Sequence, residues 1–224
     1  MRNSVSLIFF LLFCLSCHDT TGTYSIDGSA RSVADGEIIT ITTIGDSLPS
    51  LIQCRVKDGK FHIDGITDCG KVAYVGFKDA EENAGSLFFI EKGEIEIYFD
   101  TATCHVTGTP LNERYSIIED SIGYYVTELE KIETQYYSID GNNDELVRIS
   151  VKGLQLQEKL VNYLHTAVKE NVHNAIGLYL LVVYNQLFTA GELCYLMKQV
   201  PSSVIVGSNT SFYTTLTSIL EERY

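Results

Sequence analysis

The stretch HVTGTPLNERYSII, residues 105–118, marks the point at which the hydrophobic pattern of the chain changes. Thr109 suits the N-cap of a helix, and Pro110 suits the first helical position, where its missing N–H costs nothing. Before this stretch apolar residues alternate with polar ones, and after it they recur at steps of three and four. The sequence therefore predicts a β-rich domain over residues 23–108 and a helical domain over residues 109–224.

Alternation of apolar and polar residues over short runs indicates the strands of the β-rich domain. In GEIEIYFD, residues 93–100, three apolar side chains face one way, and the residues between them face the other. Asp-Gly pairs, which favour turns, stand at residues 35–36 and 58–59. Several short strands separated by turns predict an antiparallel β-sandwich or a barrel-like sheet.

Two long series with heptad-like spacing indicate the helices of the second domain. They predict helices over Pro110–Tyr137 and Asp144–Glu170 that pack as an antiparallel hairpin. Thr189 and Glu192 fit a capping box at the start of a later helix, and a last helix is expected over residues 211–222. The predicted fold class is therefore α+β. The two series are Leu111, Tyr115, Ile118, Ile122, Tyr125, Leu129, Ile132 and Tyr136, then Leu146, Ile149, Gly153, Leu156, Leu160, Tyr163 and Ala167.

The N-terminus has the pattern of a secretory signal peptide. The apolar run over residues 7–15 is shorter than the roughly 20 residues that span a bilayer. The ending Leu15-Ser16-Cys17 resembles the lipobox of bacterial lipoproteins, in which the cysteine is acylated and becomes the mature N-terminus. We expect residues 1–16 to be removed and residues 17–22 to form a lipidated tether. The protein would then be held at the outer membrane of the cell envelope, on its periplasmic or its surface side. An ordinary signal peptide with a free mature terminus is the alternative.

Charge limits the classes of partner. The chain carries 16 Lys and Arg against 29 Asp and Glu, a net charge of −13. Nucleic-acid binding needs clustered cations that neutralise phosphates, so no nucleic-acid partner is expected. An acidic surface that favours solubility accounts for the excess.

Three segments resemble one known family. They are Asp58–Gly65, Ile90–Ile97 and Val106–Asn112, and they are similar to the uncharacterised N-terminal domain (domain of unknown function 4369) of thioredoxin-like lipoproteins. The resemblance implies that a thiol-disulfide oxidoreductase module of the TlpA/ResA type normally follows. Its active-site motif, Trp-Cys-x-x-Cys, has no counterpart here, since the chain lacks Trp and the spacing occurs only at Cys14 and Cys17, which processing separates. The chain therefore resembles the accessory domain without the thioredoxin module.

Cysteine, histidine and glutamate offer few candidates for chemistry. Cys54, Cys69, Cys104 and Cys194 are widely spaced, and both disulfides and free thiols stay open for them. No metal-ligand spacing occurs among the cysteines and histidines, so no metal or cofactor is expected. Three glutamates around one hairpin turn, Glu91, Glu94 and Glu96, are expected to be solvated.

Four short patterns resemble the three-residue acceptor motif for O-glycosylation in the Gram-negative bacteria that carry this family, and two of them are expected to be the more accessible. These two are Asp19-Thr20-Thr21 and Asp46-Ser47-Leu48, which make Thr20 and Ser47 the candidate acceptors. Chance occurrence is the alternative, since so short a pattern recurs easily.

These features favour a non-catalytic module that is anchored to a membrane and binds a protein partner or a second copy of itself. The sequence contains no recognisable catalytic motif that would indicate an enzyme. One alternative is a surface protein that binds a glycan or a peptide. Another is a helper of periplasmic thiol-disulfide exchange. The sequence identifies no small-molecule ligand.

Overall fold

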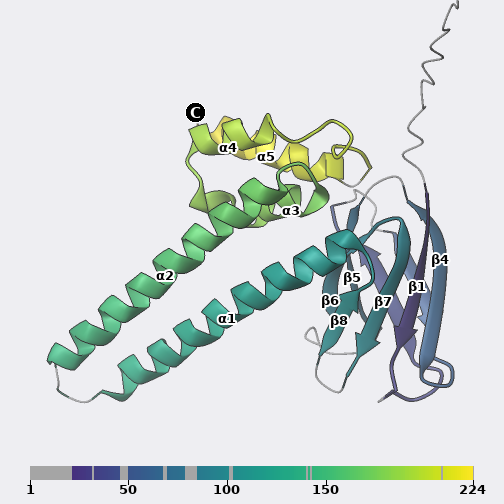
Figure 1. Cartoon of the computed structure of the whole chain (residues 1–224), viewed down its shortest axis with the longest axis horizontal. Coiled ribbons are helices and arrows are strands. Elements are labelled where there is room, and N and C mark those ends of the chain that lie inside the picture. The colour runs from purple at the N-terminus through teal and green to yellow at the C-terminus, as the bar shows by residue number, and fades with distance from the viewer. Residues whose placement is uncertain are drawn as a thin grey trace, which may run out of the picture.

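The computed structural model describes residues 22–31, 33–45, 50–67, 70–78, 85–100, 103–139, 141, 143–207 and 209–223. Within these residues strands come first and α-helices follow, so the predicted α+β class is confirmed (Figure 1). The strands are β1 (Gly22–Ser29), β2 (Ile38–Thr43), β3 (Leu51–Arg55), β4 (Lys60–Thr67), β5 (Lys71–Phe77), β6 (Ser86–Ile90), β7 (Gly93–Phe99) and β8 (Cys104–Thr107). The helices are α1 (Pro110–Ser138), α2 (Asn143–Asn171), α3 (Ala175–Val183), α4 (Ala190–Met197) and α5 (Asn209–Arg223), with a short 3₁₀ turn at Asn185–Leu187.

The strands form two four-stranded sheets, with the orders β4-β1-β7-β8 and β3-β2-β5-β6. Neighbouring strands are antiparallel except β1 and β7, which run parallel. Neither sheet closes on itself, so the expected sandwich is observed and the barrel-like alternative is wrong. Consecutive strands β3 and β4 lie in different sheets, and the turn between them crosses one end of the sandwich.

The sandwich core is built by the alternation that the sequence shows. On β7, Ile95, Ile97 and Phe99 are buried, while the residues between them are exposed. Ile41 and Val75 of the other sheet belong to the same buried cluster. The two sheets therefore pack face to face through their apolar sides, as in other sandwiches.

A second core joins the sandwich to the helices. The neighbouring residues Phe88 and Phe89 point to opposite faces of β6, so Phe88 lies in the sandwich core and Phe89 in the helical core. The rings of Phe89 and Tyr115 lie 5.2 Å apart, edge to face, and Tyr115 lies 6.1 Å from Tyr179 on α3. Most of helix α3 is buried in this core, including Ile176, Leu178 and Leu181.

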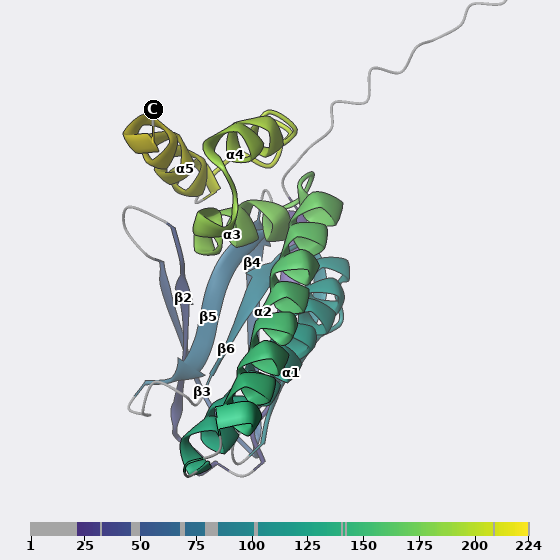
Figure 2. The same ribbon diagram turned by 90° about the vertical axis from the view of Figure 1, so that its left-hand side faces the viewer.

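The predicted hairpin is present, and its helices begin and end within two residues of the expected positions. Figure 1 shows α1 and α2 side by side, running away from the sandwich to the turn that joins them. Helices α3, α4 and α5 gather at the opposite end, where Figure 2 shows them above the β2-β5-β6 sheet. The outer part of the hairpin is therefore a two-helix layer. No helix of the described chain is long and apolar enough to cross a bilayer.

A small set of hydrogen bonds fixes α1 to the sandwich. The side chain of Asn112 bonds the backbone of the edge strand β6: its carbonyl accepts from Phe89 N–H, and its amide donates to the Phe89 carbonyl, both at 2.8 Å. The predicted N-cap Thr109 makes no side-chain cap bond. Instead the Glu91 carboxylate accepts from Leu111 N–H at 2.6 Å. The expectation that Glu91 is solvated is therefore wrong. The start of α1 is therefore held by residues of both halves.

Glycine is required at the last turn before α1. Gly108 has a φ of +94°, and a Cβ there would come within 2.5 Å of the Glu94 carbonyl oxygen. Any other residue would be strained in this conformation and would collide with β7. The Val106–Asn112 segment thus has a physical reason for its Gly, and the turn lets α1 leave the sheet directly.

Candidate functional site

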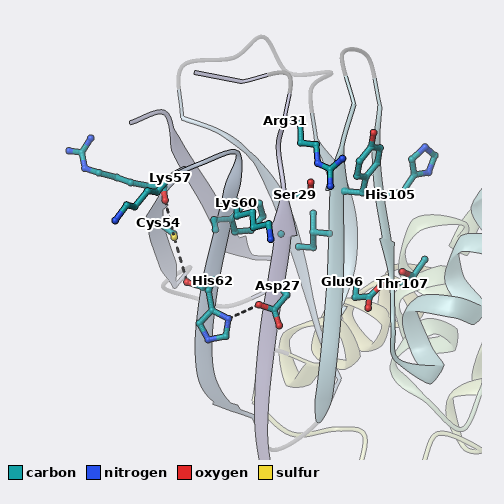
Figure 3. A pocket seen from close by; sticks show the side chains of 15 residues that line it. Asp27, Ser29, Arg31, Cys54, Lys57, Lys60, His62, Glu96, His105 and Thr107 are labelled. Carbon is teal, nitrogen blue, oxygen red and sulfur yellow. Dashed lines mark hydrogen bonds and ion pairs between the residues drawn. The ribbon is translucent and has the colours of Figure 1, made fainter. Parts of the chain in front are cut away.

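A hollow of about 930 Å³, which we call the cleft, opens on the outer face of the β4-β1-β7-β8 sheet (Figure 3). Most of the residues that line it come from the four adjacent strands of this sheet. They include Lys60 and His62 on β4, Asp27 on β1, Glu96 and Tyr98 on β7, and His105 on β8. These residues share one face because outward-pointing positions alternate with the buried ones along each strand.

Cations gather at the cleft although the chain as a whole is acidic. Arg31 follows β1, Arg55 ends β3, and Lys57 and Lys60 flank the turn between β3 and β4. The backbone N–H of Ala30 donates to the Gly59 carbonyl at 2.8 Å, which holds the segment after β1 against this turn. The chain passes from one sheet to the other between β3 and β4. This turn and the segment after β1 therefore bring basic residues that are distant in the sequence to one hollow.

His62 lies between two carboxylates at the edge of the cleft. Its Nδ1 is 2.8 Å from Asp27 Oδ1, and its Nε2 is 2.9 Å from Asp64 Oδ2. The hydrogen bond to Asp27, followed by that to Asp64, raises the pKa of His62 above its ordinary value of 6.5. Both ring nitrogens serve as donors when the imidazole is charged, so the two aspartates stabilise the cationic form.

A second hollow, of about 520 Å³, runs along the outer part of the helical hairpin, and we call it the groove. Its apolar residues include Val126, Ile132, Ile149 and Leu154, and Tyr136 and Tyr137 lie at the end nearer the turn. Leu154 is 66% exposed and Tyr137 is 77% exposed. Among the described residues, the charged side chains that line the groove are Glu130 and Glu133 on α1. It is an apolar surface with an acidic rim.

A third group of reactive residue types lies where β8 meets α1. Cys104, His105 and Glu119 line a cavity of only about 30 Å³, which holds little more than one water molecule. Burial, with a contribution from Glu119, raises the pKa of the Cys104 thiol to about 12. Burial, with a contribution from Asp120, raises the pKa of Glu119 as well. A thiol that stays protonated is a poor nucleophile, so this group is not poised for covalent catalysis.

The residues singled out from the sequence are dispersed. Cys54, Cys104 and Cys194 are free thiols on β3, β8 and α4. Cys54 lines the cleft, where its thiol lies 3.5 Å from the His62 carbonyl oxygen. Cys17, Cys69, Thr20 and Ser47 lie outside the described residues, so the anchor, any pairing of Cys69 and the glycosylation candidates stay predictions. Across the described ranges, no three His, Cys, Asp or Glu residues are grouped so as to hold a metal ion.

Sequence reasoning missed both hollows. A signal for the cleft was present in RVKDGK, residues 55–60, which holds three cations in six residues of an acidic chain. Arg31 could not have been added to them, because its approach depends on the contact between Ala30 and Gly59. The groove was missed because Ile132, Tyr136 and Ile149 belong to the two series that were expected to be covered by the packing of the hairpin helices.

One family model matches part of the chain. Residues 24–115 match a family model described as Domain of unknown function (DUF4369). The match covers the sandwich from β1 onward and ends at Tyr115, just past Asn112 and its bonds to β6. The part of the chain that matches domain of unknown function 4369 is thus the sandwich together with the attachment of α1. No curated protein matches the chain.

Proposed function

We propose that the protein is a non-catalytic, lipid-anchored module of the cell envelope that holds a helical segment of a partner protein in the groove of its hairpin. The observation that carries the proposal is the groove itself: large apolar side chains stay exposed on a two-helix layer that extends from the sandwich. Exposed apolar surface of this kind marks interaction sites in soluble proteins. Two packed helices are also the usual platform for a third helix that lays its apolar face into the groove between them.

The charge of the groove selects its occupant. Glu130 and Glu133 line it, and no Lys, Arg or His of the described part of the chain does. A second copy placed groove to groove would bring glutamates toward glutamates, which is unfavourable in a dry interface. An amphipathic helix with Lys or Arg beside its apolar stripe would instead place cations against this rim. The occupant that fits is therefore a basic amphipathic helix of another protein.

The N-terminal pattern supports the anchor. Acyl chains on Cys17 would hold the protein at a membrane, since lipidation with more than one chain gives stable attachment. The resemblance to the N-terminal domain of thioredoxin-like lipoproteins also supports an envelope location. An accessory role beside a thiol-disulfide oxidoreductase fits that resemblance. The raised pKa of Cys104 supports the absence of thiol catalysis at that residue.

The anchor is tested by replacing the acylated residue. Cys17→Ala should release the protein from the membrane fraction into the soluble envelope fraction, while Cys54→Ala should leave it membrane-bound. Membrane attachment of the Cys17→Ala protein equal to that of the wild type would contradict the anchor.

Docking is tested with a synthetic helical peptide that carries Leu along one face and Lys or Arg on both flanks. Fluorescence anisotropy should show binding of this peptide and no binding of a twin with Glu at the basic positions. Leu154→Glu should weaken binding at least about ten-fold, because it places a charge in the groove. Ile117→Glu is the matched control, since Ile117 is also 66% exposed but does not line the groove.

Two outcomes would contradict the proposal that a basic helix of another protein occupies the groove. Equal binding of the basic and acidic peptides would remove the role of Glu130 and Glu133. Dimerisation of the free protein in light scattering, abolished by Leu154→Glu, would make a second copy the occupant of the groove.

A further inference from the structure

The cleft has a charge opposite to that of the chain that forms it. Among the described residues its lining holds four Lys and Arg, namely Arg31, Arg55, Lys57 and Lys60, against the two carboxylates Asp27 and Glu96. The whole chain has 16 Lys and Arg against 29 Asp and Glu. A local excess of one sign in a hollow raises the local concentration of oppositely charged ligands. The cleft is therefore suited to an anion.

The cations of the cleft are not used to stabilise the fold through ion pairs. Among the described residues no carboxylate lies within 4.0 Å of the charged groups of Arg31, Lys57 or Lys60. Arg55 donates to the Gly36 carbonyl at 3.1 Å, which fixes its position and leaves its charge without a carboxylate partner. Charge-assisted bonds to a ligand would therefore replace water at these residues and would break no existing ion pair.

The two carboxylates limit which anion fits. Asp27 is partly neutralised by His62, but Glu96 makes no ion pair within the described residues. A carboxylate only accepts hydrogen bonds, so Glu96 would repel a compact anion such as phosphate or sulfate. It would bond readily to a ligand that also presents hydroxyl groups. The ligand that suits both kinds of residue carries acidic groups and hydroxyls together.

The position of the cleft on the sheet argues against an extended peptide. Peptides commonly bind sheets by adding a strand to a free edge, where backbone groups are unpaired. Strand β1, at the middle of the cleft, is paired on both sides, with β4 and with β7. Recognition over this face must come from side chains, and the cleft provides a row of them over four strands, or about 14 Å at the usual spacing of strands.

An aromatic side chain completes the arrangement. Tyr98 is 47% exposed, and it lines the cleft with His105 and Thr107 of the neighbouring strand β8. Figure 3 shows Glu96, His105 and Thr107 on one side of β1 and Lys57 and Cys54 on the other, with Lys60 between. The exposed ring of Tyr98 offers a flat apolar surface beside the polar groups. A sugar has matching features, because its ring has an apolar face and its hydroxyls lie around the edge.

We propose that the cleft binds an acidic oligosaccharide, with its carboxylate or sulfate groups on Arg31, Lys57 and Lys60 and its hydroxyls on Glu96 and the neighbouring side chains. The cleft is distinct from the groove of the hairpin, so this binding is independent of the docking of a helix.

The test is isothermal titration calorimetry of the full processed chain with tetragalacturonate. Maltotetraose is the neutral comparison, tetraglutamate is the peptide comparison, and sodium sulfate is the compact anion. Lys60→Gln should weaken tetragalacturonate binding about ten-fold, as expected for loss of a charged hydrogen bond. Lys159→Gln, an exposed lysine on α2 outside the cleft, should bind as the wild type does.

Glu96→Gln separates the sugar from a simple anion. Loss of the carboxylate should weaken tetragalacturonate binding, because the sugar hydroxyls lose their acceptor, while sulfate binding should strengthen, because the repulsion by Glu96 is removed. The proposal is overturned if tetragalacturonate fails to bind at millimolar concentration. It is also overturned if sulfate or tetraglutamate binds as tightly as tetragalacturonate, or if Lys159→Gln is as damaging as Lys60→Gln.

Discussion

The sandwich and the outer hairpin were predicted from equally regular patterns, yet they are buried to very different extents. In the sandwich, Ile41 and Ile95 are completely shielded from solvent, because each sheet covers the other. On α1 the only buried residue beyond Ile118 is Ile132, and on α2 the only one before Leu164 is Ile149. A heptad-like series therefore predicts that two helices pack together. Full burial of the series requires a third layer, which the outer hairpin lacks.

The largest difference should appear when one core residue of each region is shortened. Ile41→Ala should lower the free energy of unfolding by about 2–5 kcal/mol, because a cavity remains in a closed core. Leu129→Ala, at a half-buried position of the outer hairpin, should cost about 1 kcal/mol, since water already reaches the side chain. Urea unfolding followed by circular dichroism measures both. Equal losses would mean that another molecule covers the outer hairpin in solution.

The junction between the two regions should be sensitive to a single amide. Asn112→Ala removes both bonds to the Phe89 backbone and leaves these buried groups unpaired, which should cost about 2–3 kcal/mol. Glu113→Gln is the control: it is exposed, and its side-chain oxygen can still accept from Gly108 N–H. Separate unfolding transitions for the strands and the helices in Asn112→Ala would show that this residue couples the two halves.

The smallest effect should come from the surface of the sandwich. The pKa of His62 is raised in the folded chain, so its contribution to stability is complete below the unfolded value of about 6.5. That contribution is lost as the pH rises through the folded pKa. NMR titration should give a pKa for His62 above 6.5, and Asp27→Asn should lower it. An unchanged pKa in Asp27→Asn would mean that the bond to Asp27 is absent in solution.

Local patterns predicted the elements well. The helix start at Pro110 follows from backbone preference alone, and the capping box of Thr189 and Glu192 is present with both reciprocal bonds. These features need only residues that are close in the sequence. They are set by local geometry, which sequence reading captures.

Contacts between distant residues were not predictable. Glu91 was expected in solvent, but it bonds the start of α1 twenty residues later, because β8 runs antiparallel to β7 and returns the chain to the end of the sheet where β7 begins. The parallel pairing of β1 with β7 and the convergence of Arg31 with Lys60 also depend on the tertiary fold. The cleft could therefore be suspected from its basic turn and located only from the structure.

The parallel pairing of β1 with β7 also has a consequence for biosynthesis. Strand β1 is the first described element to leave the ribosome, yet it occupies an inner place in its sheet, and its neighbour β7 begins only at Gly93. Until β7 is translated, one side of β1 is an open edge that can pair with another chain. The hairpin, whose contacts are mainly local, faces no such delay. A nascent chain thus carries its aggregation risk in the half that is the better protected once folding is complete.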